Sequence, residues 1–424
     1  MLVAQLTDQL SRQGWLPQTI AKKVFLKLCA SMEHGMLGIE EGFERYHFGM
    51  PEVCGAHPVD PQHRVSIRVN SPEFYVRVVT GGANGAAEAY MDGLWETDDL
   101  VKLVRVMLLN RAQLDAMEGG VATLLGKVSQ VWHALNRNTQ EGSRRNIAAH
   151  YDLGNAFFRL FLDERLMYSS GIYPSGEETL SEASTIKLER ICQKLDLKPH
   201  DHLLEIGTGW GGMALYAAQH YGCKVTTTTI SKEQHAEAKA RIEAAGLQDR
   251  ITLLLEDYRD LQGQYDKVVS IEMVEAVGHQ YLDTYFQCIS ERLKPDGLAV
   301  LQAITIDDQR YEAALREVDF IKRYIFPGSF IPCVTVLTQS AANQGLRLFN
   351  LEDIGSSYAL TLRDWRTAFM ANLDSVRAQG FDDRFIRMWE FYLCYCEGGF
   401  RERAISTVQV LLTKSGCRRD AWLP

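Results

Sequence analysis

The sequence is short of the features that mark several large classes of protein. No stretch of its 424 residues approaches the roughly 18 consecutive apolar residues that a membrane-spanning helix needs. The N-terminal segment MLVAQLTDQLSRQG has neither a basic start nor a long apolar run, so we expect no secretory signal. The nine cysteines contain no Cys-x-x-Cys pair, and their odd number fits a reduced, cytoplasmic chain better than a disulfide framework.

Basic charge is also in short supply. The chain carries 45 Lys and Arg against 54 Asp and Glu, a net charge of −9, which argues against a dedicated nucleic-acid-binding protein. The first 150 residues are nearly neutral, with 15 basic and 16 acidic side chains, so the acidic excess lies in the remainder. A local basic cluster occurs in 121–150, at Lys127, Arg137, Arg144 and Arg145. It is typical of a solvated helix face, or of contact with an anionic surface.

The length and the ordinary apolar fraction of 46% predict a globular protein of two or three domains. In the first 60 residues, the spacing of Ile20, Val24, Leu28 and Met32 indicates helix with one apolar stripe. Residues 65–79 read instead as two short strands.

After the glycines of 81–85 we expect a helix over Ala86–Met91 and another that begins near Asp98. The sequence therefore predicts a small, mostly helical α+β domain over 1–120, followed by a basic connector over 121–145.

The pattern changes after residue 200. Five short β-rich runs alternate with helix-length segments, which predicts a parallel sheet with helices on both faces. The runs are His202–Ile206, Lys224–Ile230, Ile251–Leu255, Lys267–Ile271 and Leu298–Ile304. Residues 305–350 do not fit the alternation and are interpreted as an insertion that covers a site, whereas 360–412 return to a helical pattern.

The most informative motif is a strand that runs into glycines and then a helix, over 203–219. Glycine allows a tight turn and close approach of a ligand, and a helix N-terminus offers unpaired N–H groups. Dinucleotide-binding proteins share this arrangement. Three details favour S-adenosylmethionine: Glu205 to hold the methionine ammonium, the spacing E-x-G-x-G at Gly207 and Gly209, and the run Leu293–Gly297 before an apolar strand. A tight turn without any ligand is the alternative.

The second strand of the predicted sheet lacks the acid that usually binds the ribose hydroxyls. It ends in threonines up to Thr229, so we assign the ribose to Gln234, with Glu233 as the second candidate. Asp257, followed by Tyr258, comes after the third strand, where an acid can accept from the adenine amino group. Asp257 or its neighbour can equally be a helix cap.

Several further runs resemble the cyclopropane-fatty-acid synthase family of S-adenosylmethionine-dependent methyltransferases, over about residues 85–412. They are AYMDG at 89–93, AHYDLGN at 149–155, MYSS at 167–170, GTGWGG at 207–212, LEDYRDL at 255–261, DTYF at 283–286, YIFP at 324–327 and GGFR at 398–401. The resemblance implies a Rossmann-like methyltransferase domain over 146–424. It also adds Tyr168, Ser169 and Trp210 to the expected cofactor site.

The resemblance implies a specific chemistry as well. The family transfers a methyl group to a cis double bond of a phospholipid acyl chain, and loss of a proton then closes a cyclopropane. A bound bicarbonate is the base in the family, held by a Glu, a His and a Tyr, with backbone contacts near a Cys and an Ile. Carried over, these positions are Glu275, Gln302, Tyr358, Ser170 and Ile304.

Two of those positions depart from the family pattern. Gln302 stands where the His is expected, and it cannot carry charge or relay a proton. Ser170 stands where Cys is common, which a backbone role would tolerate. A hydride shift before proton loss would give a methyl- or methylene-branched product instead of a ring. Glu275 as a helix cap and Tyr358 as a core residue are the structural alternatives.

Cys396 aligns with a cysteine sometimes proposed as catalytic in the family, although a packing role is the alternative. The resemblance implies peripheral contact with a membrane that contains unsaturated phospholipid, at the inner face and through the N-terminal domain and the connector. Their apolar stripes can instead pack a core. We also expect a homodimer. Methylation of a soluble small molecule and a silent lipid- and cofactor-binding module are the competing functions.

Overall fold

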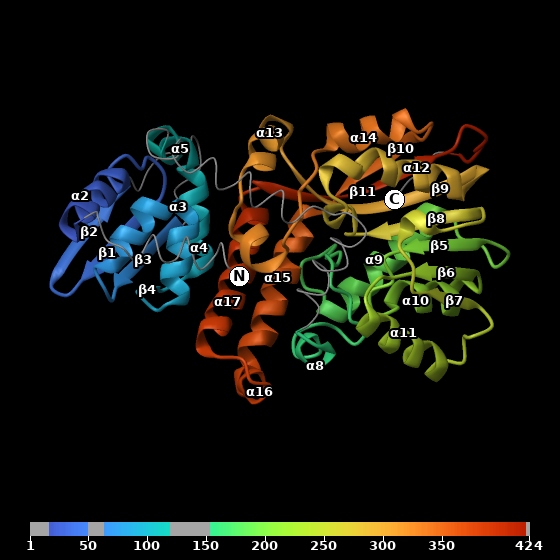
Figure 1. Ribbon diagram of the computed structural model, residues 1–424, viewed down its shortest axis with the longest axis horizontal. Coiled ribbons are helices and arrows are strands. Elements are labelled where there is room, and N and C mark those ends of the chain that lie inside the picture. Colours follow the sequence, from blue (N-terminus) through green and yellow to red (C-terminus); the bar gives the residue numbers. More distant parts are fainter. Residues whose placement is uncertain (1–16, 50–62, 119–152, 421–424) are drawn as a thin grey trace. The chain divides into compact units, whose positions relative to one another are not determined.

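The computed structural model describes residues 17–49, 63–118 and 153–420, and these form two compact units (Figure 1). The N-terminal unit takes in Met1–Leu135 together with Glu317–Ile325 and Leu373–Ala404. The second unit takes in Asn136–Arg316, Phe326–Asn372 and Ile405–Pro424. The predicted boundaries at 120 and 146, and the whole basic connector, lie outside the described residues and stay predictions.

The N-terminal unit combines a four-stranded sheet, in the order β2-β1-β3-β4, with helices. Its elements are α2 (Gln18–Cys29), β1 (Met36–Glu41), β2 (Glu44–Phe48), β3 (Arg64–Val69), α3 (Glu73–Met91), β4 (Trp95–Thr97), α4 (Leu100–Leu109), α5 (Arg111–Glu118), the π-helix η6 (Ile321–Ile325), α16 (Leu373–Ala378) and α17 (Asp383–Arg401). α17 packs on α3 and α4, where the Tyr90 hydroxyl donates to Glu390 at 2.9 Å. The predicted α+β character is therefore present, with a contribution from α17 that the sequence did not indicate.

Three local predictions for this unit are wrong. Residues 36–48 form β1 and β2 instead of helix, and the expected strand at 74–79 is the start of α3. Phe25 packs edge-on against Phe74 at 5.2 Å, so burial of one helical face outweighs the β propensity of this short run. The expected stripe on α2 is also misplaced, because Ala21, Phe25 and Cys29 are the buried residues.

Two other predictions hold. The strand at 65–69 is β3, and α4 begins where the acids indicated, with Asp99 accepting from the Lys102 backbone N–H at 2.9 Å. The glycine run breaks the pattern as well, because Gly82 adopts φ 54° and kinks α3.

The second unit is built on a seven-stranded sheet in the order β10-β11-β9-β8-β5-β6-β7. Its strands are β5 (His202–Ile206), β6 (Lys224–Thr228), β7 (Ile251–Leu254), β8 (Tyr265–Ile271), β9 (Leu293–Ile306), β10 (Arg347–Asp353) and β11 (Ile405–Thr413). Strands β5 to β9 are parallel, whereas β11 pairs antiparallel with both β9 and β10. All five predicted strands are confirmed, and so is the Rossmann-like fold class. The helix expected through 412 is wrong beyond 404, because β11 is buried between two strands.

Helices cover both faces of this sheet (Figure 1). They are α8 (Asn155–Phe158), α9 (Leu180–Leu195), α10 (Gly212–Tyr221), α11 (Lys232–Ala244), α12 (Leu282–Arg292), α13 (Asp308–Arg316), α14 (Val334–Asn343) and α15 (Gly355–Ala371), with 3-10 turns η3 (Tyr258–Asp260), η4 (Val274–Ala276) and η5 (His279–Tyr281). Alternate residues of each strand feed two separate cores, as the two-residue period of a strand requires. Leu204 packs in the core under α12 and α14, and Leu203 in the core under α9 and α10.

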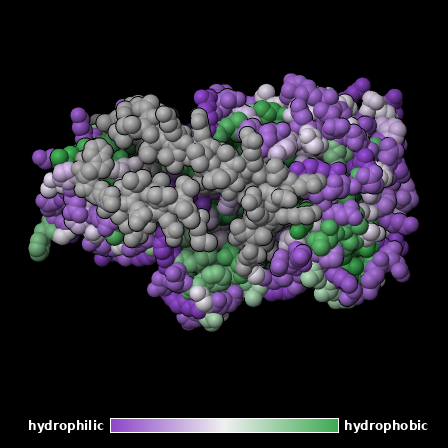
Figure 2. All heavy atoms as spheres, in the orientation of Figure 1, coloured by the Kyte–Doolittle hydropathy of each residue, from purple (hydrophilic) through white to green (hydrophobic). Residues whose placement is uncertain are grey.

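No helix within residues 17–49, 63–118 and 153–420 is long and apolar enough to cross a membrane. On the face shown in Figure 2, the surface of the second unit is mostly hydrophilic, with hydrophobic side chains gathered in smaller patches.

Candidate functional site

Most predicted site residues of the second unit lie at the carboxyl ends of the parallel strands of its sheet. The direction of chain progression reverses between β5 and β8, which are adjacent strands. In open α/β sheets, ligands bind outside the carboxyl ends of the strands at such a reversal. The glycine loop follows β5, Glu272 and Glu275 follow β8, and Ile304 lies near the end of β9.

The glycine loop has the backbone that its sequence predicts. Gly207, Gly209 and Gly211 have φ values of 100°, 52° and 87°, which side-chain-bearing residues rarely adopt. A Cβ at Gly209 would meet no atom within 4 Å, so the backbone there faces open space. The loop leads directly into α10, whose first N–H groups are available to a polar ligand.

Glu205 is a buried carboxylate, 3% exposed, at the end of β5. It accepts a hydrogen bond from the Thr227 hydroxyl at 2.6 Å, and Thr227 in turn pairs with Thr208. Burial raises the pKa of Glu205 to about 8, because only the Thr227 hydroxyl, and no cation of the described part of the chain, offsets the desolvation. A buried carboxylate of this kind fits a cationic ligand, such as the ammonium of a bound methionine moiety.

The predicted ribose-binding residues lie at the end of β6 and the start of α11. The Thr229 hydroxyl donates to Oε1 of Gln234 at 3.0 Å, and both side chains are buried. Ser231 caps α11, while Glu233 is exposed. The structure therefore turns Gln234 inward and Glu233 to solvent, which favours Gln234 for the ribose.

Asp257 follows β7 and is 1% exposed. Both oxygens of its carboxylate accept hydrogen bonds from the Arg259 guanidinium at 2.7 Å. Asp257 also caps η3, which is the helix-cap role considered in the sequence analysis. These bonds leave one lone-pair direction on Oδ2 for an adenine amino group. Tyr258 packs edge-on against Tyr285 at 5.6 Å.

An aromatic cluster adjoins the loop before α9. Tyr168 packs against Phe158 at 5.3 Å, Trp365 at 5.1 Å and Phe326 at 6.3 Å. Trp210 packs against Phe158 as well, and its indole N–H donates to Asn155 at 2.7 Å, so the Trp210 side chain belongs to this packing. From the predicted insertion, Phe326 contributes to the cluster.

Glu272, a residue that the sequence analysis missed, is the centre of the predicted catalytic group. Its Oε1 accepts from the Ser170 backbone N–H at 2.9 Å and from the Gln302 amide at 2.8 Å. Its Oε2 accepts from the Tyr358 hydroxyl at 2.7 Å. Three predicted site residues thus meet on one carboxylate. The available signal was an ionisable residue directly after the apolar strand β8.

Glu275 lies one turn further along, in η4. Its Oε1 accepts from the Ile304 backbone N–H at 2.5 Å, and its Oε2 is buried and has no hydrogen-bond partner among the described residues. Burial, and then the charge of Glu272, raise the pKa of Glu275 to about 8. Glu275 is therefore mostly protonated near pH 7.

The Gln302 amide is held on both sides. The Gln409 amide, on the neighbouring strand β11, donates to Oε1 of Gln302 at 3.0 Å. That contact directs the Gln302 NH₂ towards Glu272 and towards the Ser170 carbonyl, 3.2 Å away. The Ser170 hydroxyl donates to Gly171 instead, so only the backbone of Ser170 serves the cluster, as the sequence analysis allowed.

A fully buried lysine completes the polar surroundings. Lys187 of α9 donates from Nζ to the Ser169 hydroxyl at 2.7 Å, which engages one more predicted cofactor residue. Burial lowers the pKa of Lys187 to about 8, while the charges of Glu272 and Asp163 oppose that shift.

The residues present do not fit the bound bicarbonate that the resemblance implies. The donors expected to hold it, at Ser170, Gln302 and Tyr358, already bind the Glu272 carboxylate. The Ile304 N–H binds Glu275. A bicarbonate would have to displace two carboxyl groups and add a further negative charge to a desolvated cluster.

Cys396 lies on α17, in the N-terminal unit. Burial raises the pKa of its thiol, which keeps the sulfur protonated and weakly nucleophilic. Its catalytic role stays a prediction without chemical support.

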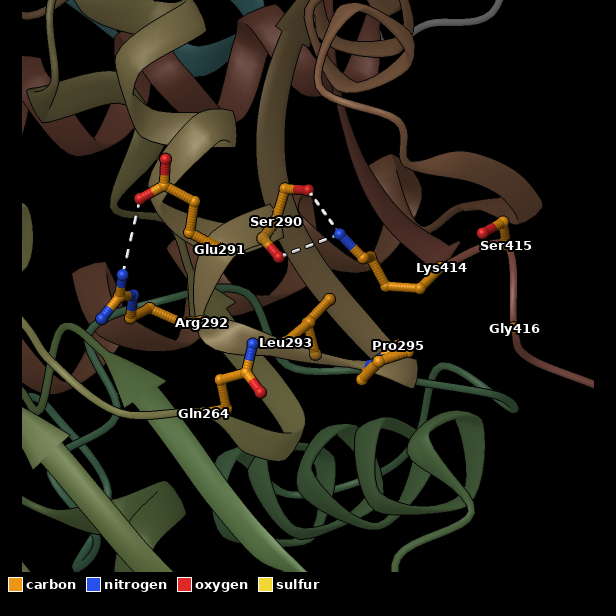
Figure 3. Close-up of a pocket in the computed structure, with 9 residues that line it drawn as sticks. All are labelled: Gln264, Ser290, Glu291, Arg292, Leu293, Pro295, Lys414, Ser415 and Gly416. Atoms are coloured by element: carbon orange, nitrogen blue, oxygen red, sulfur yellow. Dashed lines mark hydrogen bonds and ion pairs between the residues drawn. The ribbon is translucent and has the colours of Figure 1, made fainter.

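A pocket lies at the opposite end of β9, where Lys414 donates to the Ser290 hydroxyl at 2.9 Å (Figure 3). It is lined by Gln264, Ser290, Glu291, Arg292, Leu293, Pro295, Lys414, Ser415 and Gly416. Leu293 pairs with Tyr265 and Gln302 pairs with Ile271, so they lie six residues of β8 apart, or about 20 Å. This pocket is therefore not part of the candidate site.

Comparisons with known proteins agree with this geometry. Residues 138–410 match the family model for mycolic acid cyclopropane synthetase. The chain is 37% identical to the cyclopropane-fatty-acyl-phospholipid synthase of Escherichia coli strain K12, over 85% of this chain and 90% of that protein. It is 34% identical to the tuberculostearic acid methyltransferase UfaA1 of Mycobacterium tuberculosis, over 83% and 84%.

Among solved structures, the mycolic acid cyclopropane synthase CmaA1, complexed with SAH and CTAB, is similar to this chain. The TM-score is 0.60 at 29% identity, covering 64% of this chain and 98% of that one.

Proposed function

Because the chain belongs to the mycolic acid cyclopropane synthetase family of S-adenosylmethionine-dependent methyltransferases, we propose that it methylates the cis double bond of an unsaturated phospholipid acyl chain, with a cyclopropane as product. The family and the cofactor predicted from the sequence are confirmed. The relatives support S-adenosylmethionine-dependent modification of lipid acyl chains, and the choice of phospholipid and ring is the proposal.

The observation that carries the proposal is the placement of two groups on adjacent strands. The glycine loop and Glu205 end β5, and the carboxylates of Glu272 and Glu275 follow β8, which pairs with β5. When bound, S-adenosylmethionine supplies an electrophilic methyl group and keeps the carbon–sulfur electron pair. Glu205 would hold the ammonium, Gln234 the ribose and Asp257 the adenine amino group.

The aromatic cluster suits an acyl chain better than a polar substrate. Tyr168 and Phe326 are the partly exposed rings of the cluster, and the buried Trp365 packs against Tyr168 and, edge-on, against Tyr358 at 6.0 Å. Because Tyr358 donates to Glu272, apolar walls and a proton acceptor lie together. Aromatic faces also stabilise a positive charge that develops on an alkene carbon.

A branched product is the second candidate, and Gln302 favours it. The neutral Gln302 amide cannot shuttle a proton as the expected His would, and the relative UfaA1 is named a methyltransferase, not a cyclopropane synthase. Branching requires a hydride shift before the proton is lost, so slower proton removal favours the branched product over the ring.

N-terminal residues support contact with lipid. On α2, Ile20 is 49% and Val24 39% exposed, so these two side chains do not pack the core, whereas Met32 of the same predicted stripe is buried. Phe43, between β1 and β2, is fully exposed. Exposed apolar side chains beside Lys23 and Lys27 suit a surface of anionic lipid. Contact at the inner face of the membrane and a homodimer belong to the proposal as well.

The test uses the full chain with methyl-labelled S-adenosylmethionine and liposomes of mono-unsaturated phospholipid, followed by mass spectrometry of the fatty acids. Label in a cyclopropane is the expected result, and label in a methyl or methylene branch selects the second candidate. Absence of label from lipid would overturn the proposal. In a Gln302→His variant, a shift of product from branch to ring would assign the difference to that residue.

A further inference from the structure

The Glu272 carboxylate lies where three separate segments of the chain direct their donors. They are the backbone N–H of Ser170, before α9, the amide of Gln302 on β9 and the hydroxyl of Tyr358 on α15, at 2.7–2.9 Å. An ionised carboxylate is an acceptor only, so three converging donors select the charged form. Glu272 is partly buried, and hydrogen-bond donors from three segments that converge on one partly buried carboxylate are typical of a functional site.

The backbone at Glu272 is strained in a way that supports this position. Its φ of 49° is left-handed, which glycine adopts easily and glutamate does not. Its own N–H donates to the Gln302 carbonyl at 2.7 Å, which anchors the strained turn to β9. Strain of this kind persists where the surroundings fix a residue, and it concentrates at functional sites.

Glu272 also keeps capacity to accept a proton. A carboxylate has about four lone-pair directions, and the three donors occupy two on Oε1 and one on Oε2. The remaining direction on Oε2 is available. Burial raises the pKa of Glu272, while its three donors and the charge of Lys187 oppose that shift. Glu275 is the other titratable acid that acts on the site, and its own raised pKa keeps it mostly neutral near pH 7.

We propose that Glu272 is the general base of this enzyme and takes the place of a bound bicarbonate. The inference rests on the proposed function. The alkene π pair forms the bond to the incoming methyl carbon and leaves a cation on the neighbouring carbon. Oε2 of Glu272 removes a proton from the new methyl group, and the released C–H pair closes the ring onto the cationic carbon. Where a hydride shift has first moved the cation to the methyl-bearing carbon, the same C–H pair forms a methylene double bond. The neutral Glu272 acid then returns the proton to solvent.

The first experiment compares wild type in bicarbonate-free and bicarbonate-supplemented buffer, with methyl-labelled cofactor and mono-unsaturated liposomes. We expect equal rates within about twofold, because the base is part of the chain. A rate that falls at least tenfold on removal of bicarbonate would overturn the inference and leave the proposed function standing. Unlabelled lipid from wild type would remove the proposed function and this inference together.

The second experiment uses Glu272→Gly, which removes the carboxylate and relieves the left-handed backbone. We expect at least a 100-fold loss of rate in bicarbonate-free buffer, and recovery of at least tenfold with bicarbonate or formate. In addition, ¹³C-bicarbonate should bind to this variant and not to wild type, as measured by NMR. Activity that persists in bicarbonate-free buffer would overturn the inference.

Two further variants control for folding and charge. Glu272→Gln keeps the volume, so we expect it to bind S-adenosylhomocysteine, to lose activity and to resist rescue. An active Glu272→Gln would overturn the inference even if Glu272→Gly failed to fold. Asp196→Gly is the matched control, because Asp196 is also an acid at positive φ, 50°, at the end of α9. It should leave the rate and the bicarbonate response unchanged.

Discussion

Glu205 and Glu272 are two carboxylates that follow adjacent strands of one sheet, and their surroundings differ. Glu205 accepts one hydrogen bond among the described residues, from Thr227, and no cation faces it. Glu272 accepts three hydrogen bonds and feels the charge of Lys187. A carboxylate with little compensation suits a cation that arrives with a ligand, whereas a compensated one can remain charged and take up a proton.

The largest effect that this comparison predicts is on cofactor binding by Glu205→Gln. Loss of the buried charge should weaken binding of S-adenosylhomocysteine by at least about 100-fold, because the ligand ammonium would lose its buried partner. Isothermal titration calorimetry measures the dissociation constant of S-adenosylhomocysteine for each variant. Glu233→Gln, on the exposed start of α11, is the control and should change the affinity less than twofold. If both variants bound S-adenosylhomocysteine with similar affinity, Glu205 would not be the partner of the ligand ammonium.

The pH dependence of cofactor affinity is the next prediction. The pKa of Glu205 is about 8 without ligand, and only its ionised form pairs with an ammonium. The ionised fraction rises about tenfold per pH unit below 8, so the dissociation constant should fall about tenfold from pH 6.5 to 7.5. It should level off above pH 8. Calorimetry across this range should show the slope in wild type and not in Glu205→Gln; the same slope in both would assign it to another group.

Tyr358→Phe tests the other carboxylate. The hydroxyl lowers the pKa of Glu272, so its loss should raise that pKa and shift the acid limb of the rate profile to higher pH. We expect kcat at pH 7 to fall about tenfold, the effect of one hydrogen bond to a charged group. Glu275 and Lys187 also act on Glu272, and both stay in place.

The control for this variant is Tyr265→Phe, at the amino end of β8. Its hydroxyl donates to the Gln262 carbonyl, away from the site. Both its kcat and its pH profile should match wild type. If the pH–rate profile of Tyr358→Phe were not shifted, Tyr358 would have only a packing role in the core and no influence on Glu272.

The smallest predicted effect concerns the support of Gln302. Gln409→Leu removes the donor that orients the Gln302 amide, so this amide can turn its oxygen towards Glu272. We expect kcat to fall about threefold while affinity for S-adenosylhomocysteine is unchanged. Gln193→Leu, which alters an exposed glutamine of α9, is the comparison variant. Equal rates in the two variants would show that Gln302 is held in place by other contacts.

The local geometry of the predicted cofactor loop followed from the sequence, whereas the grouping of side chains around Glu272 did not. Glu205, Gly207 and Gly209 lie within five consecutive residues, so local spacing carries the information. Glu272 was missed because its partners Ser170, Gln302 and Tyr358 are 102, 30 and 86 residues away. The resemblance directed attention to Glu275, three residues along, whose place in the site is a single bond to Ile304.

The sequence by itself determined the parallel sheet, the glycine loop and the family, because strand period and short motifs are local properties of the chain. Tertiary structure decided that 74–79 is helix and that 405–413 is strand, because burial against α2, and between β9 and β10, outweighs local propensity. It also decided which carboxylate receives the three donors. That depends on how β8, β9, α15 and the segment before α9 meet, and no window of sequence contains all four.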